Sequence, residues 1–198
     1  MAYNGGLTRE QFMFSEMRIT ARLKQSGLSD EEILEKICHE NLYQYPTERE
    51  IKRKCKACLK RLKAIENMPA VVDALVSGTV SEAKQATLIA MMLQSQLLAE
   101  FMVIVIGNKY RTLDLTITRK DMNIFFQNLQ QSDENVANWS ETTINKLKVI
   151  FRTCLREAGY INGVGNDQLY PVYLSDEFID DLKNAGLSLW LPAFNVLE

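Results

Sequence analysis

The chain has 198 residues, of which 46% are hydrophobic and 24% are charged, and its formal net charge at pH 7 is −2. This length supports one domain or two small ones with a real hydrophobic core, and the composition is that of an ordinary soluble globular protein. The charge is polarised, because basic residues outnumber acidic ones up to Asn67 and acidic residues dominate after Ala158. The N-terminus lacks the charged and apolar pattern of a secretion signal, which predicts a cytoplasmic protein.

Four cysteines, Cys38, Cys55, Cys58 and Cys154, are expected to be free thiols rather than a disulfide framework. Cys38 and His39 together with Cys55 and Cys58 would make a zinc set. However, Cys55 and Cys58 fall on the apolar stripe of a predicted helix, where cysteine behaves as a small hydrophobic residue. We therefore predict no metal and no cofactor.

The first third of the chain predicts three helices, each beginning at a Ser or Thr that is followed three residues later by Glu or Gln. The expected helices cover residues 8–25, 29–40 and 47–65. Three helices in this order are compatible with a helix-turn-helix bundle, although the linker over residues 41–46 is longer than the usual tight turn.

The third of these helices is amphipathic, with Ile51, Cys55, Cys58 and Leu62 on its apolar stripe. Between residues 51 and 65 it contains no Asp or Glu, so acidic neighbours within that stretch cannot neutralise its basic face. Such a face favours an anionic partner, and phosphate is the common one. The alternative is a solvated helix surface. The basic residues on the face are Arg49, Lys52, Arg53, Lys56, Lys60 and Lys63.

The longest apolar segment covers residues 86–106, follows a helix expected between Pro69 and Gly78, and approaches the length of a membrane span. Gln94, Gln96 and Glu100 interrupt it, and these polar groups would be costly in lipid. We therefore interpret the segment as a buried helix that starts at Ser81 and predict no membrane insertion.

The last part of the chain predicts a helix from Thr118, a helix from Ser140 to Ala158, and two strands around the glycine-rich turn at residues 162–167. Helix, helix, hairpin is the order of a winged helix. In that arrangement one row of polar side chains on the second helix would approach a DNA groove. The alternative is that this row is only a solvent-exposed surface stripe. The row consists of Asn145, Lys148, Arg152 and Arg156. An acidic helix from Ser175 and an apolar tail that packs back on the bundle complete the chain.

The sequence holds little that suggests catalysis. His39 is the only histidine and has no evident Ser or Cys partner, and the glycines at residues 163 and 165 lack the following Gly and Lys of a phosphate-binding loop. The acidic pair Asp180-Asp181 has no metal-ligand spacing. We predict that the protein is not an enzyme and assign no catalytic residues.

Short phrases over nearly the whole chain carry a family resemblance. They are Gly5-Gly6-Leu7, Glu40-Asn41-Leu42-Tyr43-Gln44-Tyr45-Pro46-Thr47, Phe101-Met102 with Val105-Ile106, Lys109-Tyr110, Trp139-Ser140 with Thr143, Lys146, Leu147 and Lys148, and Ala193-Phe194-Asn195. In these phrases the chain resembles the BrxA family of BREX bacteriophage-exclusion systems. The resemblance implies a compact helical fold with helix-turn-helix character that binds double-stranded DNA beside other BREX subunits, which carry the chemistry.

The sequence thus predicts a mainly α protein: a helical bundle over residues 1–80, a buried connecting helix over 81–110 and a winged-helix-like part over 111–198. The expected function is non-catalytic binding of duplex DNA, mainly through phosphates, by the basic helix and the row on the later helix. The rival function is docking of the basic helix on other defence subunits without DNA. The sequence leaves DNA sequence preference and oligomeric state open.

Overall fold

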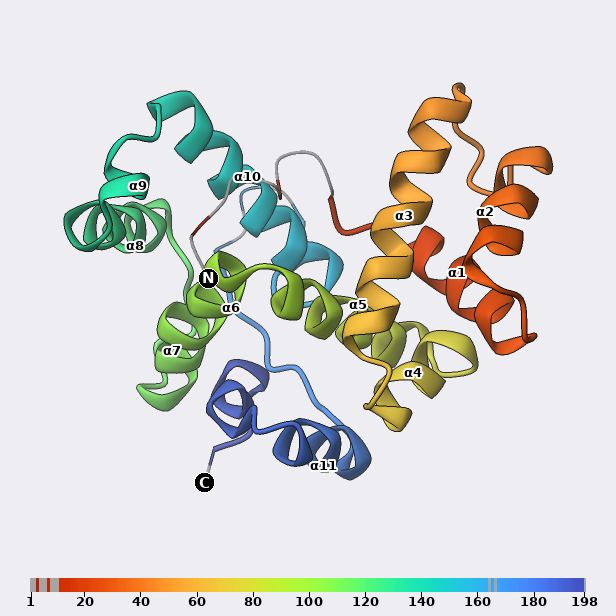
Figure 1. Cartoon of the computed structure of the whole chain (residues 1–198). Coiled ribbons are helices and arrows are strands. Elements are labelled where there is room, and N and C mark those ends of the chain that lie inside the picture. The colour runs from red at the N-terminus through yellow and green to blue at the C-terminus, as the bar shows by residue number, and fades with distance from the viewer. Residues whose placement is uncertain (1–2, 4–6, 8–10, 164, 166, 198) are drawn as a thin grey trace. The chain divides into compact units, whose positions relative to one another are not determined.

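The chain is mainly helical, with a long connection over residues 158–175 in which the described residues are not helical (Figure 1). The structure is a computed structural model that describes residues 3, 7, 11–163, 165 and 167–197. Over these residues there is no β-strand, and the pairing of extended backbone is limited to one isolated antiparallel bridge between Thr116 and Gln168. The expected mainly α class is confirmed.

Contacts divide the chain into two units. The first, called here the 12–94 unit, is Phe12–Gln94, and the second, called the C-terminal unit, combines Met1–Gln11 with Ser95–Glu198. The division expected from the sequence, with limits at residues 80 and 110, stays a prediction.

The 12–94 unit contains five helices, with a core in which α1 and α2 pack against α3 while α4 packs against α5 (Figure 1). Their bounds are α1 Phe14–Gln25, α2 Asp30–His39, α3 Glu48–Ala64, α4 Pro69–Val76 and α5 Val80–Gln94. Ile33 and Ile37 from α2, Tyr43 from the linker, and Ile51 and Cys55 from α3 form one buried cluster. The apolar stripe of α3 therefore faces the core, as the sequence predicts.

Side-chain caps begin α2, α3 and α5 of this unit, whereas α1 and α4 begin without one. Ser29 accepts a hydrogen bond from the Glu32 amide and its own amide donates to the Glu32 carboxylate, which is the expected capping box. At α1 the helix begins at Phe14 rather than near residue 8, and the expected cap Thr8 lies outside the described residues. For α5, the cap is Thr79 paired with Glu82 instead of Ser81.

The C-terminal unit is built around an aromatic core. Phe101 and Phe151 have ring centroids 4.7 Å apart, and Phe125 and Phe126 pack against them. The helices are α6 Gln96–Glu100, the π-helix η2 Phe101–Ile106, α7 Gly107–Arg111, α8 Arg119–Ser132, α9 Glu134–Ala137, α10 Glu141–Glu157, α11 Asp176–Asn184 and the 3₁₀ helix η3 Ser188–Phe194. The apolar tail forms η3 and packs on η2 and α7 as expected. A Cβ at Gly107 would lie 3.3 Å from the backbone nitrogen of Ala193, so the small residue permits this close approach.

The segment at residues 86–106 is not the single helix expected from the sequence. At Ser95 the backbone turns extended, with φ −137°, and the side chain accepts a hydrogen bond from the Leu98 amide, so α5 ends and α6 begins there. In the described part of the chain no single helix is long and apolar enough to cross a membrane. The length and apolar composition needed for a membrane span are reached only when two segments on either side of the break, Val80–Gln94 and Gln96–Arg111, are counted together.

The expected winged-helix part with a β-hairpin is wrong. The segments on either side of the glycine turn do not form a ladder. Instead, the Leu169 amide donates to the Leu115 carbonyl over 2.9 Å and the Ile117 amide donates to the Asp167 carbonyl over 2.7 Å. The Tyr170 amide does donate to the Tyr160 carbonyl across the turn over 2.8 Å, but other backbone groups that a hairpin would use bond to the connection before α8, and the described residues of this region have no strand.

Candidate nucleic-acid interface

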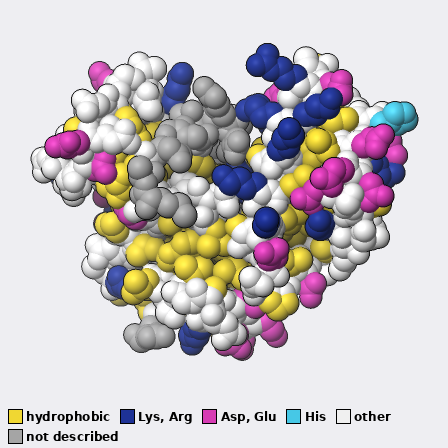
Figure 2. All heavy atoms as spheres, viewed as in Figure 1, with side chains coloured by type: hydrophobic (Ala, Val, Ile, Leu, Met, Phe, Trp, Pro, Cys, Tyr) yellow, Lys and Arg dark blue, Asp and Glu magenta, His cyan; other side chains and the backbone are white. Residues whose placement is uncertain are grey.

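Helix α3 presents the predicted basic face to solvent. Figure 2 shows dark-blue side chains gathered along this helix. The placement follows from the period of the helix, since the apolar stripe is fixed in the core and the opposite side must face outward. All six predicted residues, Arg49, Lys52, Arg53, Lys56, Lys60 and Lys63, are exposed.

The first turns of α3 neutralise part of this face. Lys52 Nζ lies 2.5 Å from Glu48 Oε1, and Arg53 Nη2 lies 3.7 Å from Glu50 Oε1. These two carboxylates lie just before the acid-free stretch of residues 51–65, which is why the composition of that stretch does not reveal them. Four basic residues of the face make no ion pair with any residue that the structure describes: Arg49, Lys56, Lys60 and Lys63.

Two further basic residues of α3 point inward and do not belong to the face. The Lys54 Nζ atom lies 4.4 Å from the centroid of the Tyr45 ring, and the Tyr45 hydroxyl donates to the carboxylate of Glu16. Arg61 is only 3% exposed, and its Nη1 atom donates to the Phe12 carbonyl over 3.0 Å. Burial and the Glu16 carboxylate raise the pKa of Tyr45, so its hydroxyl stays a neutral donor at physiological pH. Lys54 and Arg61 therefore stabilise the fold.

The predicted row on α10 is present but partly engaged within the protein. Asn145 and Arg156 are exposed, while Lys148 and Arg152 are half-buried. Lys148 Nζ donates to the Asn123 side-chain carbonyl over 2.8 Å. Arg152 Nη2 lies 2.9 Å from the carboxylate of Asp167, and its Nη1 donates to the Ile117 carbonyl over 3.4 Å.

A groove of about 840 Å³ runs along α10 and the start of α8 within the C-terminal unit. Its polar lining consists of basic and amide side chains, the hydroxyl of Thr118 and, among the described residues that line it, one carboxylate, that of Asp167. The basic and amide residues are Arg119, Lys120, Asn123, Asn145, Lys148 and Arg152. Arg119, Lys120 and Asn123 were not among the predicted site residues, because only the packing of α8 beside α10 brings them to the same groove.

The two basic surfaces arise in different units. The α3 face belongs to the 12–94 unit, and the groove belongs to the C-terminal unit. Arg156, on the last turn of α10, is not among the residues that line the groove.

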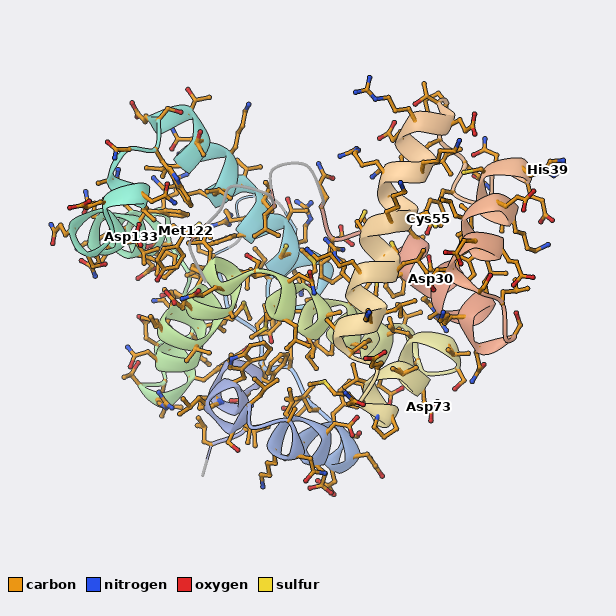
Figure 3. All side chains as sticks on the ribbon, in the orientation of Figure 1. Asp30, His39, Cys55, Asp73, Met122 and Asp133 are labelled. Atoms are coloured by element: carbon orange, nitrogen blue, oxygen red, sulfur yellow. The ribbon has the colours of Figure 1, made fainter. Side chains whose placement is uncertain are left out.

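Metal-ligating residues do not gather in the part of the chain that the structure describes: it holds no group of three or more His, Cys, Asp or Glu side chains placed to share an ion. Figure 3 shows His39 at the end of α2, apart from Cys55 on α3. His39 is exposed, and Cys55 is fully buried in the core between these helices. Cys55 therefore packs as a small hydrophobic residue.

Comparisons with known proteins agree with one another. A family model described as BrxA matches residues 1–186. A protein of Bacillus cereus (strain H3081.97) called "BREX protein BrxA" is 30% identical over 190 residues, which is 96% of this chain and 94% of that protein. A protein of the same name from Escherichia coli O9:H4 (strain HS) is 24% identical over 185 residues, covering 93% of this chain and 86% of that protein.

The fold has a counterpart among solved structures. A crystal structure of an uncharacterized protein from Magnetospirillum magneticum superposes with a TM-score of 0.80, at 24% sequence identity, over 98% of this chain and 99% of that one. This likeness concerns the fold alone. On the family model, which spans nearly the whole sequence, and on the relative from Bacillus cereus, the chain belongs to the BrxA family.

Proposed function

We propose that the protein is a non-catalytic, double-stranded DNA-binding component of a BREX bacteriophage-defence system, acting in the cytoplasm together with other BREX subunits. The relatives' shared name, "BREX protein BrxA", supports the place in BREX. Binding is mainly to phosphates and depends little on base sequence.

The observation that carries DNA binding is the unneutralised part of the α3 face. Arg49, Lys56, Lys60 and Lys63 are exposed on one helix without an ion pair to any described residue. Four like charges so close together repel each other in the free protein, and a row of phosphates relieves that repulsion. Duplex DNA supplies such a row with one negative charge per roughly 1.7 Å of helix axis.

The structure also explains why α3 tolerates this charge. Its opposite side contributes Ile51, Cys55 and Cys58, which are 3% exposed or less, so the helix is held by apolar packing rather than by surface ion pairs. The basic face is therefore available for binding at no cost to the core. The groove between α8 and α10 adds a second set of cations, and its contribution is separable because it lies in the other unit.

The test is the affinity for a labelled duplex of about 30 base pairs, measured in a salt series from about 50 to 300 mM. Wild type is compared with Lys56→Glu/Lys60→Glu. The matched control is Arg111→Glu/Lys183→Glu, which makes the same charge change at two exposed residues of the C-terminal unit that do not line the groove. Circular dichroism and urea unfolding verify that each variant is folded.

DNA binding predicts that the plot of log affinity against log salt becomes less steep in the α3 variant and not in the control. The slope should decrease by roughly 0.9 for each phosphate that the variant no longer neutralises. Equal weakening of both variants would show attraction to net charge rather than to this face. Absence of duplex binding by wild type at the lowest salt would contradict the proposal and leave docking of α3 on another BREX subunit as its role, for which a pull-down with those subunits is the next measurement.

A further inference from the structure

The lining of the groove between α8 and α10 contains an internal ion pair. Arg152 Nη2 and Asp167 Oδ1 are 2.9 Å apart, and the side chains are 24% and 45% exposed, respectively. Around them the groove carries Arg119, Lys120 and Lys148. Asp167 is thus the single carboxylate among three further cations in the described lining, and an anion from solvent can reach the pair.

The backbone holds Asp167 in place. Its carbonyl accepts a hydrogen bond from the Ile117 amide over 2.7 Å, and two residues later the Leu169 amide donates to the Leu115 carbonyl over 2.9 Å. Arg152 is fixed to the same segment, because it donates to the Ile117 carbonyl. Both partners of the ion pair are therefore anchored on residues 115–117. These backbone hydrogen bonds hold the Asp167 carboxylate near the Arg152 guanidinium even without the ion pair.

A carboxylate and a phosphodiester offer the guanidinium of arginine the same interaction, two anionic oxygens that accept its N–H groups. The other engaged cation of the groove differs, because Lys148 donates to the neutral amide of Asn123 and no charge competes for it. Among the described residues that line the groove, the carboxylate that an entering phosphate would meet is that of Asp167.

We propose that Asp167 occupies in the free protein the position that a DNA phosphate takes in the complex, and that it limits the affinity of the groove for DNA. This inference rests on the proposed function and adds its regulation: the phosphate displaces Asp167 from Arg152, and Arg119, Lys120 and Lys148 provide the surrounding positive field. Exchange of one anion for another keeps Arg152 neutralised in both states, and the displaced carboxylate of Asp167, whose side chain is 45% exposed, is left to solvent.

The test is Asp167→Asn, which keeps the size of the side chain and removes its charge. Affinity for the 30-base-pair duplex is expected to rise about three- to tenfold at roughly 100 mM salt, because no carboxylate then competes with the phosphate for Arg152. Asp180→Asn is the matched control, since it removes one exposed carboxylate from α11 in the same unit and leaves the groove unchanged. In an Arg152→Gln background the gain from Asp167→Asn disappears.

Unchanged or weaker binding by Asp167→Asn, or an equal gain in Asp180→Asn, overturns the proposal, because Asp167 would then position Arg152 or act through net charge alone. A second probe, inorganic pyrophosphate followed by NMR of backbone amides, separates this failure from that of the proposed function. If wild type binds duplex but Asp167→Asn gains nothing on either probe, DNA binding stands and the exchange is wrong. If no variant binds duplex while Asp167→Asn gains pyrophosphate affinity that Arg152→Gln removes, the exchange stands and DNA is not the source of the phosphate.

Discussion

Arg61 reaches from α3 through the core of the 12–94 unit and donates a hydrogen bond to the backbone carbonyl of Phe12, 3.0 Å away. Phe12 immediately precedes Met13, the residue in left-handed backbone conformation that comes just before α1. Arg61 thus connects the end of α3 to the entry of α1, whereas its neighbour Lys60 is exposed on the basic face.

Replacing Arg61 by Met is expected to reduce the free energy of unfolding by about 2 kcal/mol, since it leaves the Phe12 carbonyl without this buried partner. Lys60→Met changes stability by less than about 0.5 kcal/mol, as exposed substitutions usually do. For DNA affinity the order is reversed, so that Lys60→Met weakens duplex binding more than Arg61→Met does. Urea unfolding and duplex titration of the two variants measure both effects, and equal stability of the two would contradict the structural role of Arg61.

A second buried cation, Lys109 on α7, is neutralised by two carboxylates. It is 6% exposed, and its Nζ lies 2.8 Å from Asp114 Oδ2 and 3.2 Å from Asp121 Oδ1. Burial lowers the pKa of Lys109, but its hydrogen bonds to the two carboxylates outweigh this and raise it above 10.5. The hydrogen bond from Lys109 lowers the pKa of Asp114. Burial raises the pKa of Asp121, and the hydrogen bonds from Thr118 and Lys109 outweigh it, so that this pKa also lies below 3.8.

These shifts predict how stability depends on pH. Carboxylates with lowered pKa contribute stability that is present above their unfolded value of 3.8 and is lost as pH falls through the folded values below it. The raised pKa of Lys109 contributes stability that is present below 10.5 and is lost at still higher pH. Lys109→Met is expected to cost about 2 kcal/mol at neutral pH, because it leaves the partly buried Asp121 without its cation.

Urea unfolding at a series of pH values checks this prediction. The gap between wild type and Lys109→Met should be constant from about pH 5 to 9 and narrow below about pH 4, where the carboxylates protonate. Arg111→Met, an exposed change on the same helix, is the control and should show no such gap. A gap that persisted at pH 2 would mean that Lys109 acts through packing rather than through its charge.

Two buried tyrosines are expected to respond oppositely to loss of the hydroxyl. The Tyr43 hydroxyl shares a hydrogen bond of 2.5 Å with Thr20, and Tyr43→Phe should cost about 1–2 kcal/mol because Thr20 loses that partner. The Tyr160 hydroxyl is buried without a hydrogen-bond partner among the residues described. Tyr160→Phe should therefore be neutral or raise stability by up to about 1 kcal/mol. Thermal unfolding of the two variants measures the difference, and a destabilising Tyr160→Phe would reveal a partner for this hydroxyl.

The different burial of the four cysteine thiols predicts that a thiol reagent labels them selectively. Burial raises the pKa of Cys55 to about 11 and that of Cys58 to about 12, so neither forms the reactive thiolate at pH 8. Cys38 is half-buried, and Cys154 is 1% exposed. A disulfide reagent should modify Cys38 alone in the native protein and all four thiols in urea. Cys38→Ser removes the native reaction, and mass spectrometry identifies the labelled residue; fast modification of Cys55 or Cys58 would contradict their placement in the core.

Local signals in the sequence predicted much of the helical structure. Ser29, Thr118, Ser140 and Ser175 each cap a helix in the structure, because a hydroxyl and an amide three residues on are enough to make the bond. The exposed face of α3 was predictable for the same reason, since its period depends on neighbouring residues only.

The hairpin prediction was wrong because this part of the structure depends on contacts between residues far apart in the chain. The residues after α10 alternate and surround a glycine turn, as in a hairpin, yet Leu169 bonds to Leu115, more than fifty residues earlier. The residues near Leu169 in the sequence contain no pattern that indicates this pairing. The polar run of residues 94–96 marks the break at Ser95, but a polar interruption within one helix and a cap between two helices share this local pattern.

The site shows the same division. The α10 row was predicted from its period, but Arg119 and Lys120 belong to the groove only because α8 lies beside α10. Lys54 and Arg61 lie on the apolar side of α3 by the helix period, but their partners, the Tyr45 ring and the Phe12 carbonyl, became evident only from the packing.

During synthesis on the ribosome, the two units become able to fold at different times. The 12–94 unit is contiguous, so all of its helices exist once Gln94 has been synthesised, and it can fold while the remainder is still being made. The C-terminal unit is not contiguous: Tyr3 bonds to Glu100 over 2.5 Å, and η3 packs on the π-helix and α7. Its core stays open until Ser188–Phe194 emerges. The α3 face is therefore complete on a nascent chain before the C-terminal unit can complete its own core.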